Sequence, residues 1–302
     1  MLYLPEMKRY AKSITVGTIL LVTAGAFIYY LTHHPQTIDH LKQLPVVTLV
    51  GLVGLTIISF SCQILVMRAS LHLYGKRMGK QENILFNAYS SLINFFGPGQ
   101  SGPVFRGAYL KRKLNLSVKQ YLLATLIYYA FFAVMSVLLI FIGIAPWWQT
   151  AILGVVTTIA SSIIIRWYKR RSQIKAARLD SKHIAWIGIA TALQLIVQAF
   201  LYGTELHTIG AHASIAQLLS YTGVANLAMF AALTPGAIGI REAFLLFSER
   251  LHHIGSAAIV TANIVDRGVY LVFLGLLLVL ILSLHAKTKL QVAQLQSEAQ
   301  KK

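Results

Sequence analysis

The stretch that decides the fold reads GPGQSGPVFRGAYL at residues 97–110, and a second copy of its pattern reads TPGAIGIREAFL at residues 234–245. Each copy contains Pro-Gly-x-x-Gly followed by Arg-x-Ala-x-Leu, with two additional residues between these parts in the first copy. Pro lacks a backbone N–H and Gly is conformationally free, so both motifs are expected to interrupt helices. Because they lie inside the apolar stretches 84–110 and 215–247, we predict that each stretch forms two short helices joined by irregular backbone.

The composition around these motifs is that of a membrane protein. Apolar residues make up 56% of the 302-residue chain, charged residues make up only 12%, and the mean hydropathy is +0.65. Soluble domains carry about 25% charged residues, so this chain has half of the usual charge. The net charge of +18 would suit a nucleic-acid-binding protein, but the basic residues lie in short clusters between apolar runs, which excludes that class. The one cysteine, Cys62, lies inside an apolar run, so neither a disulfide framework nor a cysteine metal site is predicted.

Six further apolar runs are long enough to cross a hydrocarbon core of ~30 Å. They are Ile14–Leu31, Val46–Met67, Leu122–Ile144, Trp148–Ile165, Ile184–Leu206 and Ala257–Leu284. The first run follows basic residues as a signal peptide would, but it stays apolar past the small residues 24–26, so a retained helix is expected. The sequence therefore predicts an all-α integral membrane protein with six spanning helices, forming a single membrane domain over residues 1–302.

The distribution of Lys and Arg predicts the orientation. Of the 27 basic residues, 22 lie in the N-terminal segment, the C-terminal tail and three loops. If all six apolar runs cross the membrane, these five segments lie on the same side of it. Because basic loops stay in the cytoplasm, we expect both termini to be cytoplasmic and the protein to lie in the plasma membrane. The same distribution predicts that both broken stretches are re-entrant helical hairpins, the first entering from the cytoplasm and the second from outside.

The two Pro-Gly motifs occupy matching positions in the chain. Each is preceded by two predicted spanning helices and followed by one, so the chain is expected to form an inverted repeat with half-repeats of about 1–145 and 146–302. Interrupted segments at matching positions of inverted repeats indicate the substrate site of a transporter. The motif residues expected at that site are Pro98, Gly99, Gly102, Pro235, Gly236 and Gly239.

The segments Asn94–Leu126 and Leu233–Leu246 resemble the lysylphosphatidylglycerol synthase transmembrane family, and the similarity covers nearly the whole chain. That family is the flippase-like membrane region of multiple peptide resistance factors, and it also occurs as stand-alone proteins. The resemblance implies movement of a phospholipid, an aminoacylated phospholipid or a lipid-linked precursor between leaflets. It does not imply lysine transfer, which a soluble domain performs in the two-domain relatives. The family motif often has Gly at its third position, where this chain has Gln100 and Ala237.

Arginines follow both breaks. Ionisable side chains at bilayer depth cost roughly 2.5–3.5 kcal/mol on insertion scales, so each one needs an explanation. Arg106 and Arg241 lie where a helix N-terminus and a guanidinium fork together suit a phosphate head group. The alternative is a structural role, in which each arginine caps exposed carbonyl groups at its break or pairs with a carboxylate. The carboxylate for Arg241 would be Glu242 or Asp266, and Arg106 would simply snorkel to the interface.

Two predicted helices carry polar stripes. Asp266 and Arg267 lie about 11 residues into the last run, which is near mid-membrane at ~1.5 Å per residue. They share a helix face with Asn263 and Tyr270. They are expected either to lock two helices together or to act on the substrate or in a proton relay, gating or balancing charge as access alternates. The second polar stripe lies in the Ile184–Leu206 run and consists of Gln194, Gln198, Tyr202 and Glu205. It is expected mainly to hold neighbouring helices together by hydrogen bonds.

The remaining sequence features favour transport over catalysis. Seven of the ten histidines fall in predicted outer loops and are expected to be solvated rather than to bind metal or sense pH: His33, His34, His40, His207, His212, His252 and His253. No catalytic constellation or cofactor motif occurs, so no enzyme activity, metal or cofactor is predicted.

The favoured function is therefore a lipid translocase whose site includes Arg106, Arg241, Asp266 and Arg267, with membrane lipids as partners. One alternative is a secondary transporter of a small anionic solute, which the same architecture allows. The other is a non-transporting membrane partner of a separate lipid-modifying enzyme.

Overall fold

The computed structural model describes residues 32, 44–96, 101–171, 181–231 and 240–300. Throughout these ranges the regular structure is helical, as predicted. In chain order the elements are α3 (Val46–His72), α4 (Lys80–Phe96), α5 (Ser101–Leu114), α6 (Val118–Ile144), α7 (Trp147–Arg171), α8 (Ser181–Thr208), α9 (Ile215–Ala228), the 3-10 helix η1 (Met229–Ala231), α10 (Ile240–Phe247), α11 (Glu249–His252) and α12 (Ser256–Gln300).

Within the described ranges, five helices are long and apolar enough to span a membrane. They are α3, α6, the Trp147–Tyr168 part of α7, α8 and the Ser256–His285 part of α12, and they coincide with five of the six predicted spans. The sixth prediction, Ile14–Leu31, lies outside the described residues. The last helix differs from the prediction because it continues as one helix to Gln300, well beyond the predicted end at Leu284.

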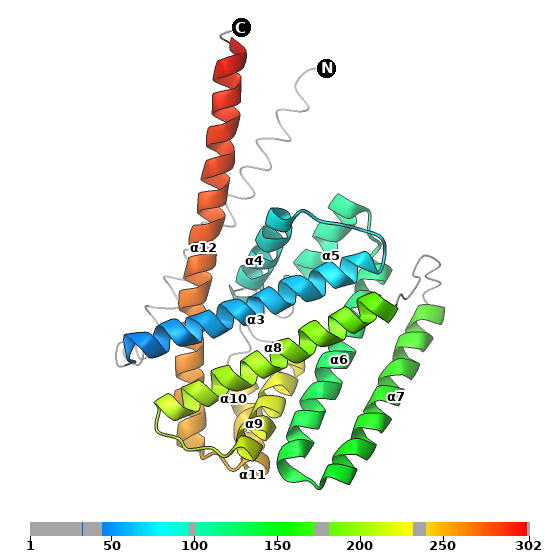
Figure 1. Ribbon diagram of the computed structural model, residues 1–302, viewed down its shortest axis with the longest axis vertical. Helices are drawn as coiled ribbons and strands as arrows, with labels where there is room; N and C mark the ends of the chain where they lie inside the picture. The colour runs from blue at the N-terminus through cyan, green and yellow to red at the C-terminus, as the bar shows by residue number, and fades with distance from the viewer. Residues whose placement is uncertain (1–31, 33–43, 97–100, 172–180, 232–239, 301–302) are drawn as a thin grey trace.

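Both broken stretches consist of short helices, as the Pro-Gly motifs predict. The first stretch forms α4 and α5, which pack against each other and flank residues 97–100. The second forms α9, η1 and α10, with residues 232–239 between η1 and α10. In Figure 1 the α4–α5 pair lies in the upper part of the molecule, whereas α9 and α11 lie in the lower part. The two breaks therefore belong to hairpins at opposite ends of the bundle.

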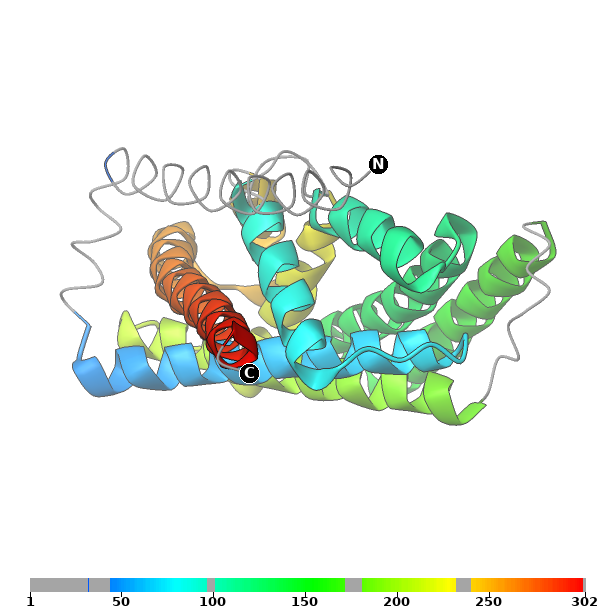
Figure 2. The same cartoon turned by 90° about the horizontal axis from the view of Figure 1, so that it is seen from above.

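The core joins the second hairpin to the spanning helices. Helices α3 and α8 pack along each other, and the view from above shows them running side by side (Figure 2). Their buried side chains form one hydrophobic cluster with α9, α10 and α12, which includes Leu52, Leu206, Tyr221, Leu245 and Ile259. Because Leu245 is completely buried in this cluster, α10 is fixed to the bundle although it has only eight residues.

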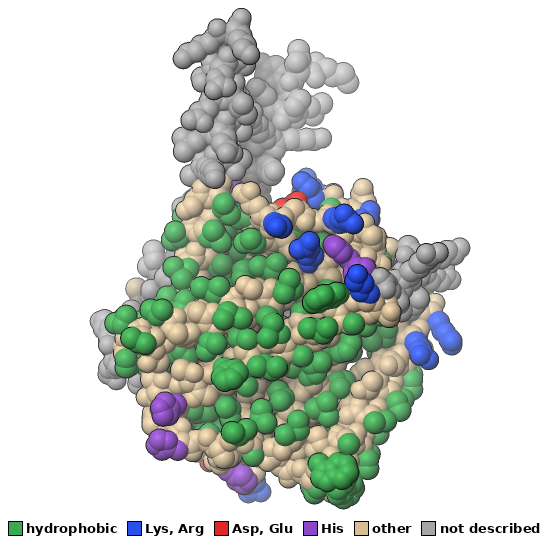
Figure 3. Space-filling model, viewed as in Figure 1, with side chains coloured by type: hydrophobic (Ala, Val, Ile, Leu, Met, Phe, Trp, Pro, Cys, Tyr) green, Lys and Arg blue, Asp and Glu red, His purple; other side chains and the backbone are tan. Residues whose placement is uncertain are grey.

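The outer surface of the bundle is apolar. In Figure 3 hydrophobic side chains cover a broad zone of the face shown, and most of its Lys and Arg side chains gather towards the upper end. Large exposed side chains are frequent along α7, among them Trp147, Val155, Ile159 and Ile163. A water-soluble monomer rarely exposes so large an apolar surface, whereas lipid acyl chains solvate it well.

The prediction of solvated histidines is wrong at His252. Its side chain is completely buried, its Nε2 lies 3.1 Å from the Leu245 carbonyl oxygen, and its Nδ1 accepts a hydrogen bond from the Ile254 N–H at 3.2 Å. Burial lowers the pKa of His252, because the buried ring lacks the water that would solvate its charged form, and this effect outweighs the attraction of Glu249. A neutral imidazole can donate to the Leu245 carbonyl and accept from the Ile254 N–H, which stabilises the connection between α11 and α12. The position of His252 in a predicted loop does not reveal this role. The exposed histidines of the predicted set are His207, His212 and His253, and His33, His34 and His40 lie outside the described residues.

Helices α6 and α9 approach each other through glycines. A Cβ atom added to Gly223 would lie 2.4 Å from the Ser136 carbonyl oxygen, and one added to Gly143 would lie 2.3 Å from the Ala216 carbonyl oxygen. Small residues allow membrane helices to come close enough for dispersion forces to hold them. This contact positions α9 and, with it, the break that follows.

We expect Gly223→Ala to force α9 away from α6 and to lower the free energy of unfolding by about 1–3 kcal/mol, the usual cost of overpacking. Gly51→Ala in α3 is the matched control, since its added methyl group would meet no described atom within 4 Å. Thermal unfolding of the detergent-solubilised variants measures the difference. Equal unfolding midpoints for the two variants would show that the α6–α9 contact is looser than the structure indicates.

Candidate functional site

The site at the second break is centred on Arg241, in the first turn of α10. The residue is only 8% exposed and lies between α8 and α12. Its Nη1 donates a hydrogen bond to the carboxylate of Asp266 on α12, forming an ion pair. Its Cζ lies 5.0 Å from the ring centroid of Tyr202 on α8, which adds a cation–π contact. The predicted alternative in which Arg241 pairs with Asp266 is thus confirmed.

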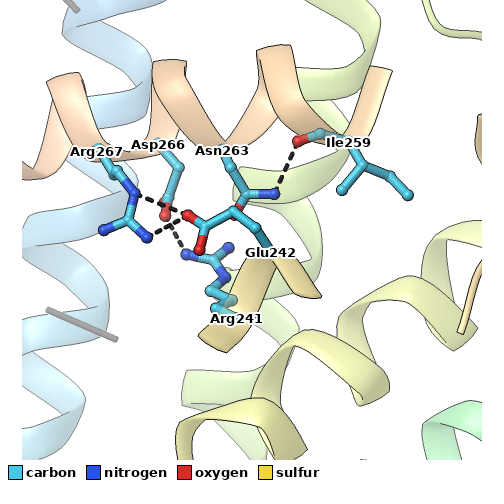
Figure 4. A network of polar contacts seen from close by, with 6 residues as sticks. All are labelled: Arg241, Glu242, Ile259, Asn263, Asp266 and Arg267. Atoms are coloured by element: carbon cyan, nitrogen blue, oxygen red, sulfur yellow. Dashed lines mark hydrogen bonds and ion pairs between the residues drawn. The ribbon is translucent and has the colours of Figure 1, made fainter. Parts of the chain in front are cut away.

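A second ion pair runs beside the first. Arg267 on α12 donates from Nε, at 2.9 Å, and from Nη2 to one carboxylate oxygen of Glu242 on α10. The consecutive residues Arg241 and Glu242 therefore face Asp266 and Arg267 with opposite signs (Figure 4). Because each charge has an opposite charge close to it, the low-dielectric interior tolerates all four.

Arg241 retains hydrogen-bonding capacity beyond its ion pair. Its Nε and Nη2 are buried, and among the described residues they have no hydrogen-bond partner. These two nitrogens form the edge of the guanidinium group that binds carboxylates and phosphates with two parallel hydrogen bonds. Arg267 uses the same edge to bind Glu242. An unsatisfied buried donor costs about 1–3 kcal/mol, and more when it is charged, so this edge is the strongest indication of a ligand in the described chain.

Glu205 of α8 is the third carboxyl group near Arg241. It is 1% exposed, and its Oε1 has no hydrogen-bond partner in the part of the chain that the structure describes. The carboxyl group interacts electrostatically with Arg241 and lies within hydrogen-bonding reach of Asp266. Tyr202, one turn earlier on α8, packs edge-on against Tyr221 of α9 at 5.8 Å between ring centroids. These aromatic rings line the cluster beside Arg241, whereas the side chains of Asp266 and Glu242 are 18% and 21% exposed.

The polar stripe of α8 divides between two roles. Its last two residues, Tyr202 and Glu205, reach the Arg241 cluster, as described above. Gln194 instead accepts a hydrogen bond from the Tyr128 hydroxyl of α6 at 3.4 Å, which joins two spanning helices. The prediction that this stripe forms hydrogen bonds between helices is confirmed for Gln194. Glu205 instead belongs to the charged cluster.

The first break carries the corresponding arginine on α5. The Nε of Arg106 donates to the Ser90 hydroxyl of α4 at 2.7 Å, so this half-buried side chain is held across the hairpin. Four residues earlier, the Gly102 N–H donates to Asn94 Oδ1 at 3.2 Å. A Cβ atom on Gly102 would come within 2.7 Å of Asn94 Cβ, so only glycine permits this approach of α4 and α5.

One residue of α12, Tyr270, lies between the two breaks. Its hydroxyl is within hydrogen-bonding reach of Ser91 on α4, and it interacts electrostatically with both Arg106 and Asp266. Its ring packs on Phe95 of α4 with 5.5 Å between centroids. The polar face predicted for α12 therefore continues from the Arg241 cluster to the α4–α5 hairpin.

The structure places half of the ten predicted site residues. Arg241, Asp266 and Arg267 form one cluster, while Gly102 and Arg106 belong to the other hairpin. Pro98, Gly99, Pro235, Gly236 and Gly239 lie outside the described residues. Sequence reasoning missed Glu242 as the partner of Arg267 and Ser90 as the partner of Arg106. The sequence did contain a signal for the pair of Glu242 with Arg267. The charges run positive then negative in Arg241-Glu242, and negative then positive in Asp266-Arg267.

These features define an all-helical integral membrane protein with a buried, ionisable site between its helices. The family model described as the lysylphosphatidylglycerol synthase TM region matches residues 14–277. Because that match covers most of the 302 residues, the chain belongs to this family, as its motifs indicated. No curated protein matches the chain.

We expect Glu242→Gln to destabilise the protein by a few kcal/mol, since removing one partner of a buried ion pair costs about 3–5 kcal/mol. The double variant Glu242→Gln/Arg267→Met should regain most of this loss, because it no longer buries the arginine charge. Glu249→Gln in α11 is the control and should leave the thermal midpoint in detergent unchanged. A double variant as unstable as the single one would contradict the importance of this pair.

Proposed function

We propose that the protein is a membrane lipid translocase that moves a phospholipid, an aminoacylated phospholipid or a lipid-linked precursor between leaflets. The observation that carries this proposal is the Nε–Nη2 edge of Arg241, a buried cationic fork without a partner among the described residues. Phosphate oxygens accept two parallel hydrogen bonds from such an edge, and all three lipid classes present a phosphate. Membership of the lysylphosphatidylglycerol synthase TM family supports a role in membrane lipid metabolism.

The polar face of α12 supports a path for the head group. Arg106 lies at one hairpin and Arg241 at the other, and Tyr270 interacts with the groups at both. In the proposed cycle the phosphate moves between the two arginines while the acyl chains stay against the apolar outer surface. Asp266 and Arg267 balance the charge of the site as access alternates. The protein has no catalytic role in this proposal, and its partners are the lipids themselves.

The proposed architecture has six spanning helices in the plasma membrane, an inverted repeat and cytoplasmic termini. Hairpins α4–α5 and α9–α10 then enter from opposite sides, which agrees with their places at opposite ends of the bundle (Figure 1). The concentration of Lys and Arg towards one end supports the same orientation (Figure 3).

Cysteine labelling tests this topology, since the only native cysteine, Cys62, is buried and can be changed to Ser. In that background, Lys80→Cys and Arg112→Cys flank the first hairpin, and His212→Cys and His253→Cys flank the second; all four positions are exposed. An impermeant maleimide added outside intact cells should label only the second pair. Labelling of one member of either pair without the other would turn that hairpin into a full crossing and remove the inverted repeat.

Arg241→Lys should slow lipid translocation while the fold stays intact. Lysine keeps the ion pair with Asp266 but cannot supply the bidentate edge, and one charge-assisted hydrogen bond contributes about 1.5–3 kcal/mol, or roughly ten- to a hundred-fold in rate. The measurement is the redistribution of a fluorescent phosphatidylglycerol in proteoliposomes. Arg250→Lys, at an exposed position in α11, is the matched control and should behave as the wild type.

Three further results decide between this role and its rivals. If Arg241 only neutralises Asp266, the single variants Arg241→Ala and Asp266→Ala should be unstable. The double variant Arg241→Ala/Asp266→Ala should then regain both stability and transport, which would refute phosphate binding. Uptake of dimethyl phosphate into the vesicles without lipid redistribution would favour a transporter of small anions. Movement of neither probe would favour a non-transporting partner of a lipid-modifying enzyme.

A further inference from the structure

The carboxyl groups of Glu205 and Asp266 form a pair whose chemistry requires a proton. Glu205 on α8 lies within hydrogen-bonding reach of Asp266 on α12. Two ionised carboxylates have only acceptor oxygens, so they hydrogen-bond to each other only through a shared proton. Glu205 is also 1% exposed, and burying a carboxylate without a partner is far more costly than burying the neutral acid. The arrangement in the structure therefore fits a protonated Glu205 that donates to Asp266.

The same glutamate is a competitor for the proposed phosphate site. Arg241 uses Nη1 for Asp266, and its Nε–Nη2 edge has no partner among the described residues. Glu205 interacts electrostatically with this arginine from the neighbouring helix. Once ionised, Glu205 would be a carboxylate within electrostatic range of this unused guanidinium edge, and a turn of its side chain towards Arg241 would form a bidentate pair. The edge has room for the two oxygens of one anion, so carboxylate and phosphate exclude each other.

We propose that Glu205 is a proton-binding residue that controls anion binding at Arg241. Protonated Glu205 turns to Asp266 and leaves the Nε–Nη2 edge to a phosphate, whereas ionised Glu205 occupies that edge itself. This inference rests on the proposed function, since it takes the phosphate of a lipid head group as the anion. One proton and one phosphodiester monoanion enter the site together, and its net charge stays the same. A proton gradient can therefore drive lipid movement.

The surroundings of Glu205 contain few other groups that could take the proton. Its own helix contributes Tyr202, α9 contributes Tyr221, α10 contributes Arg241 and α12 contributes Asp266. The part of α3 that packs here, residues 46–61, carries no titratable side chain, and neither does the end of α6, residues 130–144. Tyrosine and arginine keep their protons at neutral pH in water, so the exchangeable proton belongs to the carboxyl pair.

The test measures binding of dioctanoyl phosphatidylglycerol to the full chain in neutral detergent by calorimetry, between about pH 6 and 8.5. Its phosphodiester stays a monoanion, so linkage to one proton raises the apparent Kd of the wild type by up to about tenfold per pH unit on the alkaline side. Glu205→Gln imitates the protonated acid, so it should bind tightly at every pH. Tighter binding than the wild type at alkaline pH is a gain that a merely damaged fold would not produce.

Glu249→Gln is the matched control and should keep the pH dependence of the wild type. A second measurement needs no variant: in weakly buffered solution at alkaline pH, the lipid should withdraw about one proton per bound molecule. Wild-type binding that is independent of pH, absence of proton uptake, or an unchanged pH dependence in Glu205→Gln would each overturn the inference.

Two further measurements distinguish failure of this inference from failure of the proposed lipid function. Dimethyl phosphate carries the same anionic group without acyl chains, so its binding would identify the ligand as a free phosphodiester, and its pH dependence tests Glu205 equally well. In proteoliposomes, a pH gradient should accelerate translocation of fluorescent phosphatidylglycerol by the wild type and not by Glu205→Gln. Translocation without any response to pH would overturn only the role of Glu205, whereas absence of both binding and translocation would overturn the lipid function as well.

Discussion

The ion pair between Arg241 of α10 and Asp266 of α12 is the interaction on which the rest of the site depends. α10 is a helix of eight residues that directly follows the second break, so its own hydrogen bonds cannot hold it in place. The adjacent pair of Glu242 with Arg267 adds a second attachment, and the formal charges of the four residues sum to zero. Inside the bilayer this pairing stabilises the inserted helices, because a single unpaired charge would make insertion of its helix costly.

The same constraint is compatible with the proposed transport role of this position. The pairing of Arg241 is incomplete, since Nη1 is used while the Nε–Nη2 edge has no described partner, and a third carboxyl group, Glu205, lies beside it. In the proposed cycle, the arrangements of this site differ in which anion holds the guanidinium group. A head-group phosphate and a proton are two ligands that would shift this balance, and both cross membranes only at sites that neutralise them.

Close approach of helices supplies the rigid frame that such a site needs. Gly102 lets α5 approach α4, and Gly223 and Gly143 let α9 approach α6. Lipid tails provide no hydrophobic force between helices, so this contact and polar bonds such as that of Arg106 with Ser90 hold the hairpins in place. Gly102, Gly143 and Gly223 thus serve the contact between helices.

The sequence by itself determined the helical class, the five described spans, the interruption of both broken stretches and the presence of ionisable residues at depth. These properties follow from hydrophobic length and from Pro and Gly, which act locally along the chain. Only the tertiary structure decided that Glu242 binds Arg267, that Glu205 lies beside Asp266, and that His252 is buried. Each of these contacts joins different helices or closes a turn between them, and helical periodicity indicates which face is polar but not which neighbour that face meets.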